Sequence, residues 1–294
     1  MPGGFHKMKI KIVTDSTCDL SHAFTAQNDI AVIPMRIFFG EQEFVDGVNI
    51  SSPQFYQRLK TAKQVPMTRQ PSPGDFIEVY QRYLKNYDYI LSIHLSSNLT
   101  TSVQSALAAR SFFIKNKNLM NKIKIFDTRT TSLGLGFIVW EVLDAMSQKT
   151  KMPALEKLIE SLSKRTQMYF VVPSLEYLYR GGRIGLAEHL MGSLGKKKPI
   201  LSLSGEKGIV ESAGTVGRIE EGIDYLVDAV KKNIKQSQTK RVGIIHTQNS
   251  AQAAILQNRL AEVLNPEIQF IVHEASPVLA AHTGPGGIGV VFLR

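Results

Sequence analysis

The chain ends on a glycine-rich turn, His282-Thr283-Gly284-Pro285-Gly286-Gly287-Ile288-Gly289, which runs into the apolar stretch 290–293. The turn matches the dinucleotide pattern G-x-G-x-x-G, but that pattern needs a following helix whose N-terminus holds the phosphate. Too few residues follow Gly289 for such a helix, so we expect no Rossmann site here. The pattern instead predicts a turn with little side-chain bulk, beside a histidine and a hydroxyl that can bond a ligand.

Length and composition favour an ordinary globular protein. With 294 residues and 43% hydrophobic content, the chain can bury a large core and is predicted to form two domains. Its one cysteine, Cys18, excludes an internal disulfide and fits a reducing compartment. No apolar run approaches the ~20 residues that span a bilayer, and residues 1–7 lack the apolar core of a secretory signal. We therefore expect a cytoplasmic protein without stable membrane insertion.

The first part of the chain, residues 8–150, alternates short apolar runs with helical periodicity. Strands are predicted at residues 9–13, 31–39, 87–95 and 122–126. Apolar residues recur with a helical period over 76–84 and more loosely over 103–113. This alternation predicts an α/β domain in which helices flank a parallel sheet.

The second part, residues 151–294, has a different pattern. Strands are predicted at residues 168–172, 199–203, 241–245 and 269–272, with helices near 219–230 and 251–264. The run 204–208, Ser-Gly-Glu-Lys-Gly, is typical of a hairpin turn and indicates antiparallel pairing. We therefore expect a C-terminal α+β domain with a mixed or antiparallel sheet.

Short hydroxyl side chains gather where the predicted strands of the first domain end. They lie in residues 14–17, 96–102 and 127–132. Each group on its own fits a helix N-cap. Ligands of open α/β sheets, however, bind beyond the carboxyl ends of the strands. Together with Thr68, the three groups predict a hydroxyl-lined mouth that can hold an anionic head group.

Seven motifs occur in the order seen in the DegV family, and they cover nearly the whole chain. The Gly-Gly-Arg-Ile and His-Thr-Gly-Pro-Gly elements are the most specific of them. The motifs are Thr14-Asp15-Ser16-Thr17-Cys18-Asp19-Leu20, Asp46-Gly47, Thr68-Arg69-Gln70-Pro71-Ser72, Ser96-Ser97-Asn98-Leu99, Leu175 to Ile184, Lys198-Pro199-Ile200-Leu201 and His282 to Gly286. The chain thus resembles a DegV family protein.

This resemblance implies a carrier that holds one long-chain fatty acid between two domains. Such a carrier presents the carboxyl group to a separate fatty acid kinase, which makes acyl phosphate for phospholipid synthesis, and it has no catalytic residue or cofactor of its own. The family pattern places carboxylate contacts on Thr68, Ser96 or Ser97, and His282. The neighbouring Thr283 and Gly284 complete the implied ligand site.

Two arginines are candidates for contact with the kinase or a phosphate group. Arg183 follows the pair Gly181-Gly182, which is predicted to cap a helix, and a cation on such a turn suits a phosphate or carboxylate. Relatives often carry an arginine where this chain has Gly217, so Arg218 is its candidate replacement. The chain also departs from the family pattern at Arg69 and Thr101.

Two other functions are open to the sequence. A serine esterase could use Ser96 or Ser97 with His282 and Asp15 or Asp127, although no Gly-x-Ser-x-Gly elbow is present. The net charge of +10 and the pI of about 9.6 would suit a nucleic-acid binder, but no recognisable motif accompanies them. No His, Cys, Asp or Glu spacing indicates a metal site. We expect a monomer that binds no nucleic acid.

Overall fold

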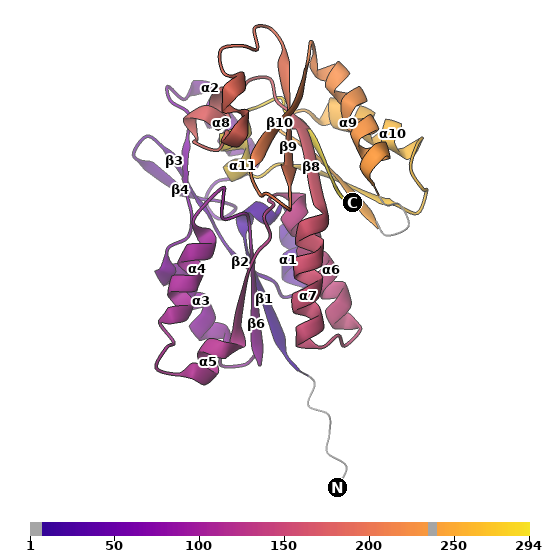
Figure 1. Ribbon diagram of the computed structural model, residues 1–294. Coiled ribbons are helices and arrows are strands. Elements are labelled where there is room, and N and C mark those ends of the chain that lie inside the picture. Colours follow the sequence, from indigo (N-terminus) through magenta and orange to yellow (C-terminus); the bar gives the residue numbers. More distant parts are fainter. Residues whose placement is uncertain (1–7, 235–239) are drawn as a thin grey trace.

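The computed structural model describes residues 8–234 and 240–294, which form two parts, one above the other in Figure 1. The lower part is built on a parallel sheet and the upper part on a mixed sheet, which confirms the predicted α/β fold class. Residues 1–7, on which the expectation of no secretory signal rests, lie outside the described residues.

The first sheet has four parallel strands in the order β2-β1-β6-β7. Their bounds are β1 Ile10–Asp15, β2 Ala31–Ile33, β6 Tyr89–His94 and β7 Ile123–Asp127. The strands predicted at 9–13, 87–95 and 122–126 are confirmed. One face is covered by α3 (Pro73–Tyr83) and α4 (Ser102–Ser111), whose apolar residues pack on the strands. The short elements η1 (Ser16–Cys18) and α5 (Lys117–Lys122) adjoin the ends of β1 and β7, and α1 (His22–Gln27) contacts Trp140 through Phe24.

The single strand predicted at 31–39 is wrong, because the chain changes sheets at Pro34. Proline has no backbone N–H to donate to a sheet ladder. After Pro34, β3 (Arg36–Phe39) leaves the parallel sheet and pairs antiparallel with β4 (Gln42–Val45) and β5 (Met67–Arg69). Helix α2 (Ser52–Thr61) packs on this small sheet, which the sequence analysis did not predict.

The second sheet has six strands in the order β10-β9-β8-β13-β11-β12. Their bounds are β8 Thr166–Val171, β9 Lys198–Ser204, β10 Val210–Val216, β11 Arg241–His246, β12 Gln269–Glu274 and β13 Ile288–Leu293. Strands β9 and β10 form the predicted hairpin. The apolar run at the end of the chain becomes β13, which lies in the middle of the sheet and pairs antiparallel on both sides.

Helices α9 (Ile219–Asn233) and α10 (Ser250–Ala261) cover one face of the second sheet and share its core. Helix α8 (Glu176–Arg180) packs against α11 (Pro277–Thr283), and η2 (Gly185–Leu190) lies beside β10. No helix of the described part of the chain is both long enough and apolar enough to cross a membrane.

Helix α6 (Leu133–Ser147) lies between the two sheets. It contacts β6 of the first sheet and β8, β11 and β13 of the second. Nearly every residue of its first two turns is buried, as expected for a helix that is apolar all round. Helix α7 (Met152–Arg165) packs beside α6 on the first sheet. The domain boundary at 150, just before α7, stays a prediction.

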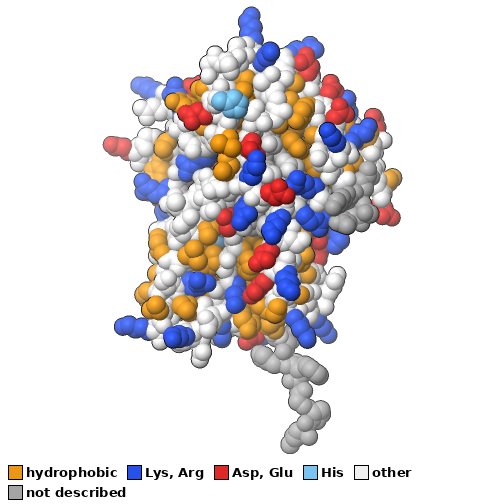
Figure 2. Space-filling view, in the orientation of Figure 1, with side chains coloured by type: hydrophobic (Ala, Val, Ile, Leu, Met, Phe, Trp, Pro, Cys, Tyr) orange, Lys and Arg blue, Asp and Glu red, His pale blue; other side chains and the backbone are white. Residues whose placement is uncertain are grey.

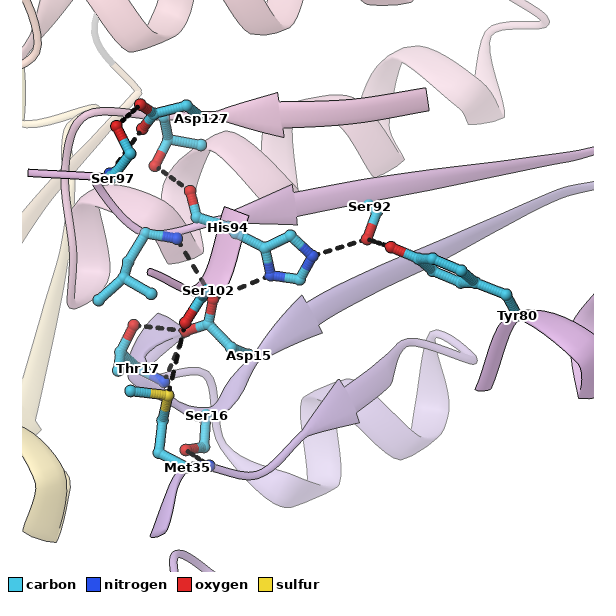
Figure 3. A network of polar contacts seen from close by, with 12 residues as sticks. Asp15, Ser16, Thr17, Met35, Tyr80, Ser92, His94, Ser97, Ser102 and Asp127 are labelled. Carbon is cyan, nitrogen blue, oxygen red and sulfur yellow. Dashed lines mark hydrogen bonds and ion pairs between the residues drawn. The ribbon is translucent and has the colours of Figure 1, made fainter. Parts of the chain in front are cut away.

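A chain of buried polar side chains ties the first sheet to α3 (Figure 3). The Asp15 carboxylate accepts hydrogen bonds from His94 Nδ1 (3.0 Å), Leu95 N (3.2 Å), Thr17 N (3.2 Å) and Thr17 Oγ1 (2.6 Å). On its other side, His94 Nε2 bonds Ser92 Oγ at 2.6 Å. The Ser92 hydroxyl in turn bonds the Tyr80 hydroxyl of α3 at 2.7 Å. Because both oxygens of Asp15 are used, the network fixes the end of β1 and the loop after it.

Replacing Asp15 with alanine should therefore destabilise the fold strongly. The change leaves four donors without their acceptor inside the protein, which costs roughly 3–5 kcal/mol. The matched change Glu78→Ala removes only an exposed ion pair with Arg82 and should cost less than about 1 kcal/mol. Denaturant unfolding of both variants measures the difference, and equal losses would show that the network does not stabilise the sheet.

Candidate functional site

A cavity of about 930 Å³, counted with its open mouth, lies between the two parts of the molecule. Its wall is mostly apolar and comes from both sheets, including Leu95, Leu99, Met168, Phe170, Val172 and Leu203. The predicted strand-end hydroxyls also reach it, at Thr17, Thr68, Thr100, Thr131 and Ser132. A mostly apolar cavity with a few polar groups in its wall suits an amphiphilic ligand.

Thr68 and His282, both predicted site residues, meet in the cavity wall. The Thr68 Oγ1 lies 2.7 Å from His282 Nε2, although the two residues are 214 positions apart in the sequence. Thr68 is placed by strand β5, where it pairs with Ile37 of β3, and His282 lies near the end of α11. Helix α11 packs against β3, β5 and α2, which brings the two side chains together.

Burial keeps the His282 imidazole neutral. Desolvation, helped by the nearby positive charge of Arg183, lowers the pKa of His282 to about 3. Its Nδ1 is buried and has no hydrogen-bond partner in the protein. We assign the ring proton to Nε2, because this choice leaves no buried N–H without an acceptor. The ring then donates to Thr68 Oγ1, and the Thr68 hydroxyl proton is free to bond a ligand oxygen.

Arg183 brings a positive charge to the same cavity. Its Nε donates to the Leu99 carbonyl at 2.9 Å and its Nη1 to the Gly181 carbonyl at 2.6 Å, so the side chain bridges the two parts of the molecule. Among the described residues, no carboxylate pairs with it. Partial burial lowers the pKa of Arg183, but the group stays charged at neutral pH. An unpaired cation in an apolar cavity favours an anionic head group.

The two serines of the Ser-Ser motif do not form part of the cavity wall. Ser96 Oγ donates to the Gly208 carbonyl of the β9–β10 turn at 2.7 Å, and Ser97 Oγ donates to Asp127 Oδ2 at 2.5 Å. Both hydroxyls thus already have acceptors in the protein. Their predicted contact with a ligand carboxylate stays a prediction, and it requires one of these bonds to break.

Thr100 was not singled out by the motifs, yet it lies in the cavity wall. Its side chain is buried and its Oγ1 has no hydrogen-bond partner. Thr131, in the loop after β7, has the same properties. The signal that pointed to both was the crowding of hydroxyls at the strand ends, which did not say which hydroxyls were free.

The remaining predicted residues take different places. Thr283 lines the cavity, and its hydroxyl donates to the Leu279 carbonyl within α11 at 3.0 Å. Gly284 ends α11 at a positive φ of 71° but is not part of the wall. Arg218 is exposed at the start of α9, where it pairs with Glu221 at 3.2 Å. Arg218 is therefore not part of the cavity site.

The catalytic triad that an esterase would need is not assembled. The histidine next to Asp15 is His94, Asp127 holds Ser97 with no histidine between them, and His282 bonds Thr68. Ser92, His94 and Asp15 are connected like a triad in Figure 3, but all three are fully buried and none lines the cavity. No substrate can reach them, so the buried set is structural.

Charges on the surface are mixed. On the face drawn in Figure 2, Lys and Arg side chains lie among Asp and Glu. Several basic residues are paired, such as Arg36 with Glu43 and Lys207 with Glu211. The excess of basic residues therefore does not form a continuous basic stripe on this face. Within the described ranges, no group of three or more His, Cys, Asp or Glu side chains could hold a metal ion.

The low pKa of His282 predicts a pH-dependent share of stability. Between pH 6.5 and about 3 the unfolded histidine takes up a proton that the folded one does not, so protonation favours unfolding in this window. Asp46, whose pKa burial raises to about 7, has the opposite effect, because the folded carboxyl keeps its proton and its stabilising effect is lost as pH rises.

Comparing the protein with its His282→Asn variant removes the Asp46 contribution, which both share. The unfolding free energy of the original, minus that of the variant, should shrink as pH falls from 7 to 4, by at most about 1.4 kcal/mol per pH unit. Urea unfolding at several pH values gives this difference. A difference that stays constant with pH would show that folding does not lower the pKa of His282.

Comparisons with known proteins agree with the fold and the motifs. Residues 9–294 match the model of the DegV family, described as uncharacterised proteins. A DegV domain-containing protein of Deinococcus radiodurans is 31% identical over 287 residues, which are 97% of this chain and 98% of the relative.

Solved structures give the same result. A DegV family protein from Thermus thermophilus, whose structure concerns its fatty acid binding, matches with a TM-score of 0.88 and 31% identity, over 98% of this chain and 100% of that one. DegV from Bacillus subtilis, described as a fatty acid binding protein, matches with a TM-score of 0.86 and 27% identity, over 97% and 99% of the two chains. This chain is therefore a member of the DegV family.

Proposed function

We propose that this protein binds one long-chain fatty acid in the cavity between its two parts. The observation that carries the proposal is a mostly apolar cavity that has a hydroxyl, a neutral imidazole and an unpaired guanidinium in its wall, at Thr68, His282 and Arg183. The fatty acid binding described for the Thermus thermophilus and Bacillus subtilis relatives supports the same ligand class.

The acyl tail supplies most of the binding free energy in this proposal. Burying about fifteen methylenes at ~0.8 kcal/mol each gives on the order of 12 kcal/mol before the costs of ordering the ligand. Each charge-assisted hydrogen bond to the carboxylate adds roughly 1.5–3 kcal/mol. The tail thus sets affinity, while the head-group contacts decide which end of the ligand lies at Thr68 and His282.

We further propose that the carrier presents the carboxyl group to a separate fatty acid kinase, which forms acyl phosphate for phospholipid synthesis. In the cavity wall the Thr68 hydroxyl meets a His282 ring whose lowered pKa makes it a poor general base and whose Nδ1 is held by no carboxylate, which supports a role in presentation rather than catalysis. Arg183, which is charged and partly exposed at the cavity, is the residue proposed to meet the kinase or the phosphorylated head group. Exposed Arg218 is a second candidate for the kinase contact. We place this carrier in the cytoplasm, which the single buried Cys18 supports, and we propose that it is a monomer.

The head-group assignment predicts a selective effect of Thr68→Val. This change keeps the shape of the side chain but removes the hydroxyl, so oleate should bind about tenfold more weakly while oleyl alcohol changes less. Competition binding with both ligands measures the selectivity. Equal losses for Thr68→Val would contradict its role at the carboxylate.

The separate variant Ser96→Ala tests whether Ser96 contacts the carboxylate. An equal effect on the binding of both ligands would mean that the Ser96 hydroxyl stays bonded to the Gly208 carbonyl when the ligand is bound.

The presentation step predicts that Arg183→Ala separates binding from turnover. Because Thr68 and His282 contact the carboxylate in this proposal, and the Arg183 guanidinium already donates to two backbone carbonyls, fatty acid affinity should change by less than about threefold. Acyl phosphate formation with a cognate kinase and ATP should fall sharply. Arg180→Ala is the matched control, since Arg180 is exposed nearby and pairs with Glu176. A parallel loss of binding and turnover in Arg183→Ala would place this arginine among the carboxylate contacts instead.

A further inference from the structure

Two adjacent glycines, Gly181 and Gly182, follow helix α8 beside the Thr68–His282 pair, and their backbones differ. Gly182 has a φ of +67°, a left-handed conformation that favours glycine, and a side chain there would meet no atom within 4 Å. Gly181 has φ −75° and ψ −9°, which any residue can adopt. Gly182 thus supplies the helix cap, and backbone conformation does not explain why position 181 is also glycine.

The lack of room for a side chain explains why position 181 is glycine. A Cβ on this residue would lie 2.3 Å from His282 Nδ1 and 3.0 Å from His282 Cε1. The nearest other atom, the Tyr177 carbonyl oxygen at 2.9 Å, belongs to the same helical turn and accepts the Gly181 N–H. The imidazole therefore stands directly against the Cα of Gly181, at a distance that no residue with a side chain would allow.

The contact also limits where the ring can go. His282 is held at Nε2 by Thr68, whereas its buried Nδ1 has no hydrogen-bond partner. Within the described part of the chain, the side of the ring that carries Nδ1 is thus positioned by packing, with Gly181 against it, and not by a hydrogen bond. A methyl group there would push the ring away and lengthen or misalign its bond to Thr68.

Gly181 contacts the second polar group of the site as well. Its carbonyl accepts a hydrogen bond from Arg183 Nη1 at 2.6 Å. One residue therefore sets the place of the imidazole through its missing side chain and the place of the guanidinium through its carbonyl. The spacing between the two groups depends on how closely α8 approaches α11.

We propose that Gly181 is a positioning residue that determines the preference of the site for a carboxylate head group. The missing side chain at this position lets the neutral ring of His282 lie against the end of α8 with Nε2 directed at Thr68. This inference rests on the proposed fatty acid binding and deepens it. Gly182, next in sequence, has no part in that preference.

The test compares Gly181→Ala with Gly182→Ala in binding of oleate and oleyl alcohol. Gly181→Ala should weaken oleate binding about tenfold and leave the alcohol within about threefold, because only the carboxylate uses the aligned Thr68–His282 pair. Gly182→Ala strains a left-handed residue and should lower the melting temperature, yet keep the ratio of the two affinities. An unchanged ratio in Gly181→Ala, or an equal change in both variants, would overturn the inference.

A double variant shows whether the effect passes through the ring. In a His282→Ala background the imidazole is gone, so adding Gly181→Ala should not lower the ratio further. A second drop of similar size would mean that Gly181 acts through Arg183 or the helix backbone, and would overturn the role assigned here. If Gly181→Ala alone fails to fold, the double variant should fold, since the close contact is removed. Failure of both would place the conflict at the Tyr177 carbonyl and contradict the proposal.

The result is distinguishable from failure of the proposed function. If the unchanged protein binds neither oleate nor the alcohol, fatty acid binding itself is wrong. If it binds oleate and loses selectivity in His282→Ala but not in Gly181→Ala, only the role of Gly181 is wrong.

Discussion

The hydrogen bond between Thr68 and His282 is the contact on which the site depends. It joins a short strand of the first part to a helix near the end of the chain, at 2.7 Å. The bond needs three things: the small sheet that holds β5, the packing of α11 on that sheet, and the close approach of α8. Burial makes the imidazole neutral, so the pair acts through hydrogen bonds, and the positive charge comes from Arg183.

The hydroxyls at the strand ends differ in whether the protein already supplies a hydrogen-bond acceptor for them. Thr17, Ser96, Ser97 and Ser132 donate to protein acceptors and fix loops or join the two parts of the molecule. Thr100 and Thr131 face the cavity without a partner. A buried hydroxyl without a partner is unfavourable, and a ligand in the cavity can satisfy those of Thr100 and Thr131. Thr14 and Thr130 also lack a partner, but they do not line the cavity.

Much of the fold follows from local patterns in the sequence. Alternating apolar runs predicted three strands of the parallel sheet and the β9–β10 hairpin, because burial and turn chemistry act locally. Strands β3, β4 and β5 were missed or merged, since Pro34 moves the chain to another sheet and no local pattern says which sheet follows. The place of β13 in the middle of a sheet likewise depends on partners far away in sequence.

The motifs pointed to several residues of the candidate site, but not to the contacts between segments that lie far apart in the sequence. Thr68 and His282 were predicted as ligand contacts and Arg183 as a contact of the kinase or a phosphate group. All three lie in the cavity wall, and their roles stay predictions. The sequence could not show that Ser96 bonds Gly208, that Thr100 is free, or that Gly181 contacts a ring about a hundred residues further along the chain. These are contacts between distant segments, and they become visible only when the chain is folded.

Mass spectrometry of lipid extracted from the natively purified protein tests the central claim most directly. An empty apolar cavity forfeits contacts along its walls, so the cavity should hold a ligand during purification. The account predicts about one long-chain fatty acid per chain. Protein that carries no lipid, and that also fails to bind added oleate or palmitate, would contradict it.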